Sequence, residues 1–514
     1  MMDDYDASGK VPLNLGAPED FRRVAGILRD AGFTEQAICT RLGIEELHRI
    51  DSPFIAKAAK DLEEARDPLA SWILLFVLGR PLHRSRLESM LSREELAALR
   101  ALDLLRLDAA RELCVAPVRL VSLAAIPGSG GELLIASDRG NHPDGTPLRP
   151  FPDFVFSAHN PLTRQFLSLL PAGPAATVLD LCTGTGVAAL AAASSAERVV
   201  AVDIAARSAH FAAFNRLLNG VGNVEIMTGD LYEPVAGMSF DRIIAHPPYV
   251  PSFYDAPIYR NGGDTGEKVV RRILQGIPEH LNRGGTFHTL GIAMDAEGKL
   301  FEERAREWMG GGQDIDLIFA LREPKAPEEF GRLLGSRSVG AELQVYERWM
   351  QLARSMRIEN VVYGALVGHR HPVPRKAQTR RVQFGSGVDA RNFERLFGWF
   401  DWLEAPGAAE RILEVRLRMP PELKLEVTYG AAGGELQPEQ FHVVGGGATF
   451  PTKVQVDAWV VSVLVGFASG KRGLEVYADL SDRGKVPPGG GKAEFAELLL
   501  WLVERDILRL EDPQ

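Results

Sequence analysis

Carboxylates occur at the ends of three successive predicted strands, where the ligand crevice of a parallel sheet opens. Asp180 ends a buried apolar strand and precedes a glycine-rich turn, 182–186, whose backbone a ligand can approach closely. Asp203 lies 23 residues further on, where it can accept hydrogen bonds from both hydroxyls of a ribose. Asp230 follows the next strand, where an adenine ring can lie. This spacing predicts a nucleoside site.

A second group with chemical potential follows the fourth strand and reads Ala245-His246-Pro247-Pro248-Tyr249. A neutral imidazole accepts one hydrogen bond, or acts as a general base with a reference pKa near 6.5. The two prolines stiffen the loop and fix the direction of its backbone carbonyl. The segment is therefore a candidate catalytic loop at the same edge of the sheet.

The stretch 150–375 resembles the class I S-adenosylmethionine-dependent methyltransferases, in which an acid precedes a Gly-x-Gly-x-Gly run. Here Cys182 stands where the first glycine usually is. A dinucleotide site of the NAD type is the alternative, and the second motif disfavours it. The resemblance implies that S-adenosyl-L-methionine is the cofactor and is bound by Asp180, Cys182, Thr183, Gly184, Gly186, Asp203, Ile204, Asp230, Leu231 and His246.

The segment ending in Tyr249 resembles the Asn-Pro-Pro-Tyr motif of amide and amine N-methyltransferases. These include the release-factor glutamine, N6-adenine DNA and several rRNA guanine methyltransferases, and the flanks resemble those of large bacterial enzymes of the glutamine branch. In the family, the Asn side chain and the next carbonyl accept hydrogen bonds from the target NH2, and the aromatic ring stacks on it. The resemblance implies the catalytic residues His246, Pro247, Pro248 and Tyr249.

His246 departs from this pattern, because an imidazole cannot offer an acceptor and a donor side by side. The methylated group can therefore also be an amine, a hydroxyl or an activated carbon. The structural alternative is that His246 only caps the end of the strand. Downstream, Gly262-Gly263-Asp264 resembles a segment of the glutamine branch, with Asp264 as the predicted helix cap. The aromatic residues Phe253, Tyr254 and Tyr259 are candidates for the substrate pocket or for core packing.

Alternating strand and helix patterns position these residues and predict a parallel, helix-covered sheet. Predicted strands are 177–181, 198–203, 224–227, 240–245, 286–292, 315–321 and 360–367, and helices include 205–219 and 267–281. We expect an α/β fold with a Rossmann-like seven-stranded methyltransferase sheet over 150–375, with a helical insertion at 322–357.

Both flanks predict small accessory modules. Residues 1–149 combine helices, a capping box at Ser92 and strand patterns at 115–123 and 132–135, which suggests a winged-helix-like module. A Gly- and Pro-rich linker is expected at 128–152. Residues 376–514 are expected to form an α+β, winged-helix-like module with strands at 412–419, 423–429 and 441–444 and a helix at 492–505.

Composition limits the class of protein. The 514 residues carry a net charge of −10, which weighs against a protein that coats nucleic acid along its length. Three distant cysteines fit a reducing cytoplasm and disfavour a Cys-rich zinc site and a disulfide framework, and no metal is expected. The acidic residues 1–6 are unlike a signal peptide, and no apolar run reaches the roughly 20 residues that span a bilayer.

Three functions follow as hypotheses. The first is a methyltransferase that modifies a nitrogen of a protein, peptide or small molecule. The second is an RNA or DNA base methyltransferase, favoured by the winged-helix modules and by the basic stretch 370–381, whose alternative role is a solvated linker. The third is a non-catalytic, cofactor-sensing DNA-binding regulator. Winged-helix modules also mediate contacts between proteins, including dimer contacts. We expect no membrane partner.

Overall fold

The computed structural model describes residues 11–50, 52–124, 131–142, 146–148, 150–253, 256–310, 313–338, 340–373, 375–432, 435–445, 447, 449–487 and 489–511. The acidic residues 1–6 and part of the predicted linker, 128–130, lie outside these ranges. The chain divides into two compact units. The first comprises Met1–Gly311 and Ala326–Val361, and the second comprises Gly312–Lys325 and Val362–Gln514.

Eight strands are hydrogen-bonded in one mixed sheet in the order β13-β11-β12-β10-β9-β6-β7-β8. Their bounds are β6 Ala175–Leu181, β7 Ala196–Asp203, β8 Val224–Thr228, β9 Phe240–Ala245, β10 Leu281–Ala296, β11 Ile315–Leu321, β12 Ile358–Arg370 and β13 Thr379–Gln383. The prediction of an α/β fold is confirmed, but the predicted number of seven strands in the sheet was wrong. The basic stretch 370–381, for which a solvated linker was the alternative role, leads into β13, and this strand pairs in parallel with β11.

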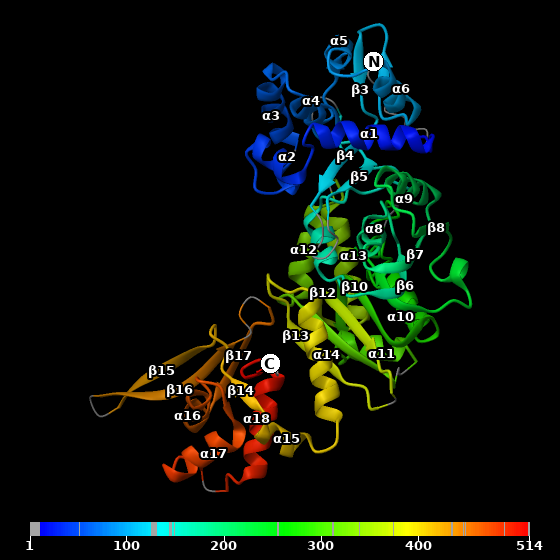
Figure 1. Cartoon of the computed structure of the whole chain (residues 1–514). Coiled ribbons are helices and arrows are strands. Elements are labelled where there is room, and N and C mark those ends of the chain that lie inside the picture. Colours follow the sequence, from blue (N-terminus) through cyan, green and yellow to red (C-terminus); the bar gives the residue numbers. More distant parts are fainter. Residues whose placement is uncertain are drawn as a thin grey trace. The chain divides into compact units, whose positions relative to one another are not determined.

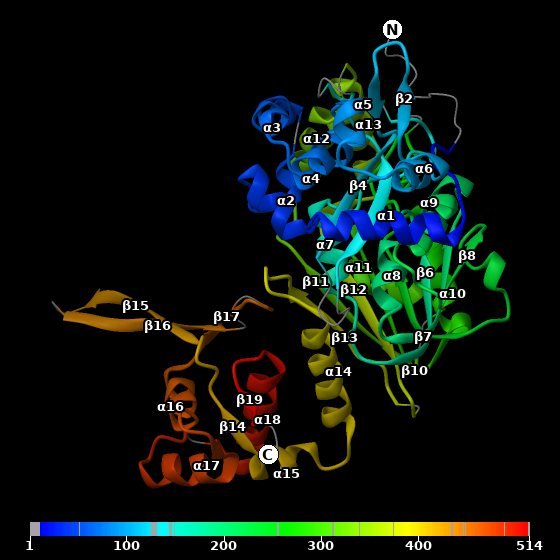
Figure 2. The same cartoon turned by 45° about the horizontal axis from the view of Figure 1, so that its top comes forward.

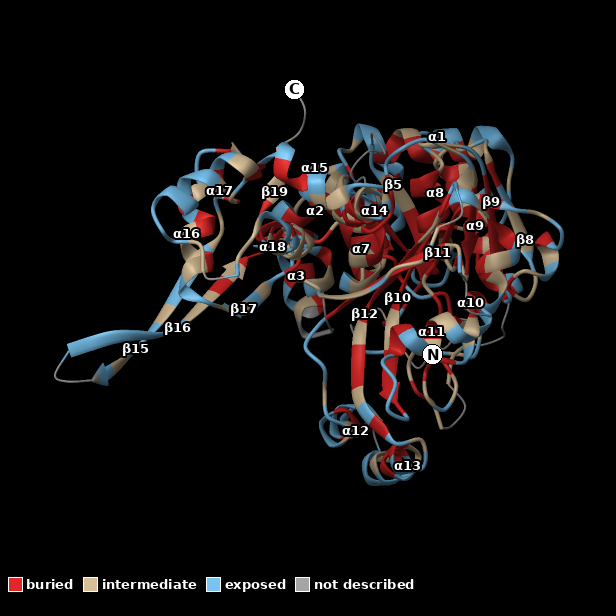
Figure 3. Ribbon diagram, turned by 90° about the horizontal axis from the view of Figure 1, so that it is seen from below, coloured by how far each residue is buried: buried red, intermediate tan, exposed pale blue. Residues whose placement is uncertain are grey.

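Within this sheet β6, β7, β8, β9 and β10 are parallel, with β6 between β7 and β9. Apolar residues dominate β6, β7 and β9, as is usual for parallel strands that helices cover on both faces. Figure 3 shows β9 and β10 as largely buried. The covering helices are α7 Pro161–Ser168, α8 Val187–Ala192, α9 Ala206–Leu218, α10 Lys268–His280 and α11 Phe301–Trp308. Figure 1 shows α8, α9, α10 and α11 beside the strands of the sheet. The carboxyl ends of β6, β7, β8 and β9 thus share one edge.

The N-terminal part of the first unit is mostly helical. Its elements are α1 Pro18–Asp30, α2 Glu35–Leu42, η1 Leu47–Arg49, α3 Ser52–Glu64, α4 Pro68–Trp72, the π-helix η2 Ile73–Leu78, β1 Leu82–His83, α5 Arg84–Glu88, α6 Arg93–Ala101, β2 Arg106–Asp108 and β3 Leu113–Val115. The capping box at the start of α6 is confirmed, because the Ser92 hydroxyl accepts from the Glu95 amide and Glu95 accepts from the Ser92 amide. The short strands form a sheet in the order β1-β3-β2.

A separate hairpin, β4 Val118–Leu123 and β5 Leu133–Asp138, joins this part to the parallel strands. The two predicted strand patterns, 115–123 and 132–135, thus pair with each other as β4 and β5, in a sheet separate from β1-β3-β2. The free edge of β5 is bound by two asparagines of α9. The Asn215 carboxamide pairs with the N–H and C=O of Ala136, and the Asn219 carboxamide does the same at Leu134. Each side chain replaces a missing neighbouring strand.

The predicted helical insertion is present as α12 Pro327–Ser336 and α13 Glu342–Ser355. Its apolar core is centred on Trp349, whose ring lies 4.9 Å from Phe330 and whose indole N–H donates to the Pro327 carbonyl. Val250 and Phe253, which follow the predicted catalytic loop, pack against the same cluster. The insertion therefore supports the loop that begins at Tyr249.

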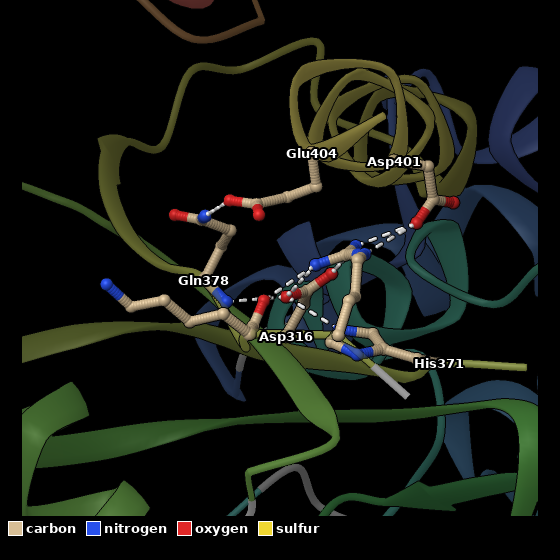
Figure 4. Close-up of polar contacts among 7 residues, drawn as sticks. Asp316, His371, Gln378, Asp401 and Glu404 are labelled. Carbon is tan, nitrogen blue, oxygen red and sulfur yellow. Dashed lines mark hydrogen bonds and ion pairs between the residues drawn. The ribbon is translucent and has the colours of Figure 1, made fainter. Parts of the chain in front are cut away.

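In the second unit, a buried ionic cluster fastens helix α14 (Ala390–Glu404) to β11 (Figure 4). Asp316 of β11 is fully buried and accepts from Arg375 at 3.1 and 2.5 Å and from the Gln378 amide at 2.6 Å. Arg375 also donates to Asp401 of α14 at 2.7 Å. The His371 Nε2 lies 2.9 Å from Asp316. The segment between β12 and β13 is therefore ordered by charge pairing.

The remaining elements of the second unit are α15 Ala408–Glu414, β14 Arg416–Arg418, β15 Lys424–Ala432, β16 Glu435–Gly445, β17 Thr452–Val456, α16 Ala458–Gly466, β18 Lys471–Arg472, α17 Gly473–Asp482, α18 Lys492–Glu504 and β19 Arg509–Leu510. The hairpin β15–β16 extends away from the helices of its unit (Figure 2). The strand predicted at 412–419 was wrong in its first half. The good helix formers of 408–414 continue as α15, with Ile412 and Leu413 buried. No helix among the described ranges is long and apolar enough to cross a membrane.

Candidate active site

A cavity of about 730 Å³ opens at the carboxyl edge of the parallel strands in the first unit. Its walls include twelve of the thirteen different residues that the sequence predicts for the cofactor and the catalytic loop: Asp180, Cys182, Thr183, Gly184, Asp203, Ile204, Asp230, Leu231, His246, Pro247, Pro248 and Tyr249. Gly186 does not line the cavity. A Cβ there would lie 2.9 Å from the Cβ of Ala212, so this glycine serves the contact between α8 and α9.

The glycine-rich turn takes the backbone conformation that the predicted nucleoside site requires. Cys182 has φ +60°, which is a left-handed conformation and explains why glycine is usual at this position. Gly184 has φ +55°, and a Cβ built on it would meet no atom within 4 Å, so its backbone is open to the cavity. The turn thus leaves room for a ligand against its main chain.

Two carboxylates hold this turn in place. Asp180 is buried and accepts from the Thr183 hydroxyl at 2.5 Å and from the Ala189 amide at 3.1 Å, and burial raises the pKa of its carboxyl to about 7. Asp203 accepts from the amides of Gly184 and Ala205, both at 2.9 Å. Each oxygen of Asp203 receives one of these bonds, so lone pairs remain for ligand hydroxyls.

The third strand end also carries a charge pair. Asp230 accepts from both terminal nitrogens of Arg272, at 2.9 and 3.0 Å, and both residues line the cavity. Beside them, Ile204 is 56% exposed and offers an apolar surface to a planar ring. Asp203 and Asp230 thus place carboxylate oxygens in the same cavity wall as the exposed side chain of Ile204.

His246 lies between two aromatic rings in the cavity wall, directly after the end of β9. Its ring centroid is 5.0 Å from that of Phe166 and 5.7 Å from that of Tyr249, with interplanar angles of 27° and 26°. Burial lowers the pKa of His246 to about 4, so the imidazole is neutral at pH 7. Its Nε2 is buried and has no hydrogen-bond partner among the described residues. A ligand group is therefore the natural partner for this nitrogen.

Glycines seat the loop that carries Tyr249. The Tyr249 ring covers Gly291 of β10, where a Cβ would lie 3.1 Å from the tyrosine Cβ. A Cβ on Gly266 would lie 2.3 Å from the Tyr249 carbonyl oxygen, so only glycine allows this approach. The prediction that Asp264 caps the next helix was wrong. Helix α10 begins at Lys268 after Glu267, whose carboxylate instead binds Arg304 and the Met294 amide.

A buried ion pair shapes the wall opposite this loop. Arg207 of α9 donates to Asp138 of β5 at 2.8 and 2.6 Å, and Asp138 also accepts from the Val155 amide. Val155 and Phe156 line the cavity. The N-terminal hairpin thereby orients a wall of the site, a role that no local sequence pattern reveals.

Several lining residues were not predicted from the sequence. Phe166 was assigned only to a helix face, and the insertion contributes Arg337 without any motif to mark it. Of the predicted pocket aromatics, Tyr259 lines the cavity and Phe253 packs against the insertion. Tyr254 lies outside the described residues. No group of metal-ligating residues occurs in the part of the chain that the structure describes.

Comparison with known proteins agrees with this geometry. Residues 154–294 match the family described as the methyltransferase small domain. A ribosomal protein uL3 glutamine methyltransferase of Bradyrhizobium diazoefficiens is 36% identical over 146 residues, covering 26% of this chain and 46% of that protein. A release factor glutamine methyltransferase of Thermodesulfovibrio yellowstonii is 31% identical over 121 residues, covering 21% of this chain and 43% of that protein.

A second release factor glutamine methyltransferase, from Xylella fastidiosa, is 32% identical over 136 residues, covering 24% of this chain and 50% of that protein. The chain thus spans about half the length of these relatives. The fold and the matched segment define a class I S-adenosylmethionine-dependent methyltransferase domain. Within that class, residues 154–294 are similar in sequence to the glutamine methyltransferases, and S-adenosylmethionine is the cofactor of the class.

The cofactor end gives a direct test. Asp203→Ala is expected to weaken S-adenosylhomocysteine binding by about tenfold or more, because a carboxylate that accepts from ligand hydroxyls is lost along with its bond to the Gly184 amide. Isothermal titration calorimetry on the full chain measures the change. Asp264→Ala, an exposed acid outside the cavity, is the matched control and should bind as the wild type does. Unchanged affinity in Asp203→Ala would place the cofactor elsewhere.

Proposed function

We propose that the protein transfers a methyl group from S-adenosylmethionine to a nitrogen of a protein or peptide substrate. The observation that carries the proposal is the neutral His246 in the cavity wall, whose buried Nε2 has no hydrogen-bond partner among the described residues. The similarity to glutamine methyltransferases supports a nitrogen on protein as the target.

The residues of the loop have separable tasks in this proposal. S-adenosylmethionine, when bound, supplies an electrophilic methyl group on a positively charged sulfur. With the ring proton on Nδ1, the Nε2 of His246 accepts a hydrogen bond from the target N–H and directs the nitrogen lone pair toward the methyl group. After transfer, the same nitrogen atom can receive the proton that the substrate nitrogen releases. Phe166 and Tyr249 hold the imidazole between their rings.

The charges of the second unit weigh against a nucleic-acid substrate. Three residues of the basic stretch that we considered as a phosphate-binding segment are engaged inside their own unit: Arg370 pairs with Asp314, Arg375 pairs with Asp316 and Asp401, and Arg381 lies over the Phe319 ring. A groove that follows a phosphate backbone needs free cations. These three side chains instead make contacts within their own unit.

We propose further that the two flanking parts are winged-helix-like protein-contact modules. Support comes from two similar element orders, α4-η2-β1-α5-α6-β2-β3 and α16-β18-α17-α18-β19, each with a small three-stranded sheet. The helices at the usual DNA-reading place, α6 and α18, carry acids in their first turns, which phosphates would repel. A cytoplasmic location and assembly into dimers remain parts of this proposal.

The state of His246 can be measured without a substrate. Because its pKa is lowered to about 4, its ring should not titrate between pH 5.5 and 8, and histidine-labelled NMR spectra, assigned with His246→Asn, would record this. The unfolded chain takes up this proton near pH 6.5, so the stability that His246 contributes is lost as the pH falls from about 6.5 toward 4. A midpoint near 6.5 would mean that the imidazole is solvated and not buried.

Direct assay separates the proposed enzyme from the regulator. The purified chain is incubated with tritium-labelled S-adenosylmethionine and with proteins or RNA extracted from cells in which the gene is deleted. Label in protein supports the proposal, and label in RNA overturns it in favour of a base methyltransferase. Cofactor binding without transfer to either fraction favours the regulator.

A further inference from the structure

The open end of the cavity has an apolar wall made by two chain segments. The Ile258 amide donates to the Pro152 carbonyl at 2.7 Å, which joins the segments 152–160 and 256–261. Across this junction the rings of Phe156 and Tyr259 stack at 4.9 Å, with 13° between their planes. Phe156 and Ile258 are each 42% exposed, although both line the cavity. Apolar surface of this kind at a cavity mouth is available to a substrate.

Cations surround the same opening. Arg260, Lys268 and Arg337 line the cavity, and none of them has an acidic partner within ion-pair distance among the described residues. The carboxylates at the cofactor end are bound to backbone amides, to Thr183 or to Arg272. Asp153 is the one acid among the lining residues of the mouth that the structure describes. The mouth is therefore positively charged, although the whole chain has a net charge of −10.

Arg337 reaches this mouth because the helical insertion is fixed in place. It is the residue that ends α12, and a Cβ on Gly331 of that helix would lie 2.7 Å from the Trp349 ring, so α12 and α13 are in close contact. Arg348 of α13 lies over the Phe253 ring at 5.8 Å. These contacts tie the insertion to the segment that follows Tyr249. A cation on a fixed support at a cavity mouth can select a ligand by charge.

We infer that the substrate is an acidic peptide segment, in which a carboxylate close to the methylated nitrogen is bound by Arg260 and Arg337. The inference rests on the proposed function and names its substrate class. A guanidinium binds a carboxylate through two parallel hydrogen bonds, which gives direction as well as charge. A neighbouring apolar residue of the peptide packs against Phe156 and Ile258. The insertion that carries Arg337 is then the element that determines specificity.

The test uses three fluorescent peptides of equal length with a central glutamine flanked by glutamate, by serine or by lysine. The full chain saturated with S-adenosylhomocysteine is titrated, and anisotropy reports binding without catalysis. The glutamate peptide should bind at least about tenfold more tightly than the lysine peptide. The preference should fall to about threefold or less in Arg260→Gln/Arg337→Gln and be partly kept in Arg337→Lys. Arg332→Gln, an exposed site on the same helix outside the cavity, is the control.

The outcomes distinguish this inference from the function on which it rests. Equal binding of the three peptides, no binding of any of them, or a preference that survives in the double variant would overturn the inference. Displacement of the glutamate peptide by a single-stranded oligoribonucleotide at low concentration would overturn the peptide class. Charge-selective binding without label transfer from S-adenosylmethionine would overturn the proposed function alone. Label transfer without a charge preference among the peptides would support the proposed function and overturn the inference of an acidic substrate. Unchanged S-adenosylhomocysteine affinity shows that each variant is folded.

Discussion

His246→Ala is expected to reduce methyl transfer by about 10²- to 10⁴-fold while leaving S-adenosylhomocysteine affinity within about threefold of the wild type. The loss is large because, in the proposed function, the imidazole is both the acceptor that orients the target nitrogen and the base that receives its proton. Binding is spared because the acids that hold the turn, Asp180 and Asp203, are untouched. Transfer of tritium from labelled S-adenosylmethionine to protein, together with calorimetry, measures both quantities.

Two further variants sharpen this experiment. His246→Asn keeps a hydrogen-bond acceptor and should retain transfer at least about tenfold above that of His246→Ala. His83→Ala removes an exposed histidine far along the chain from the catalytic loop and should have no effect. If His246→Ala keeps full transfer, the imidazole serves only to pack between Phe166 and Tyr249.

Asp316→Asn is expected to destabilise the second unit by about 3–5 kcal/mol, which is the usual cost of removing one partner from a buried ion pair. The substitution keeps the shape of the side chain but removes the negative charge that Arg375 and His371 face inside the protein (Figure 4). Chemical denaturation measures the free energy of unfolding. Hydrogen exchange over β11 and β13 assigns the change to this unit.

Asp401→Asn is the matched comparison for that experiment. Asp401 binds the same guanidinium as Asp316, but its side chain is 49% exposed and remains hydrated. Its loss should therefore cost less than about 1 kcal/mol. Equal effects of the two substitutions would show that burial of Asp316 adds nothing to the strength of its contact with Arg375.

Patterns along the sequence predict the parallel strands and the carboxylates at their ends well, because each strand is largely apolar and each acid lies within two residues of the end of its own strand. Asn160 and Pro161 likewise mark the start of α7 through local geometry, and the Asn160 side chain accepts from the Leu162 amide as expected. The candidate site is thus largely readable where function depends on the ends of consecutive elements. The assignment of individual site residues to the cofactor and to catalysis stays a prediction.

The rest depends on partners that are distant in the sequence. The strand β13 contains two adjacent arginines and a single large apolar residue, Val382, so its own residues do not predict a strand, and its pairing with β11 creates one. Nothing in the sequence distinguishes Arg337 from the many other basic residues, because only the fold of the insertion places it at the cavity. Asp264 looked like a cap because Asp is favoured there, but the Thr265 hydroxyl accepts from the Glu267 amide and the helix starts later.

The pairing of Asn215 and Asn219 with β5 has a consequence for the history of this protein. Asn215 also donates to the Thr185 carbonyl of the cofactor turn, so one carboxamide serves the N-terminal hairpin and the methyltransferase domain at once. A catalytic domain that lost the hairpin would expose these carboxamides and the buried face of α9 to water. Exchange of the hairpin for that of a relative would therefore require matching changes along α9.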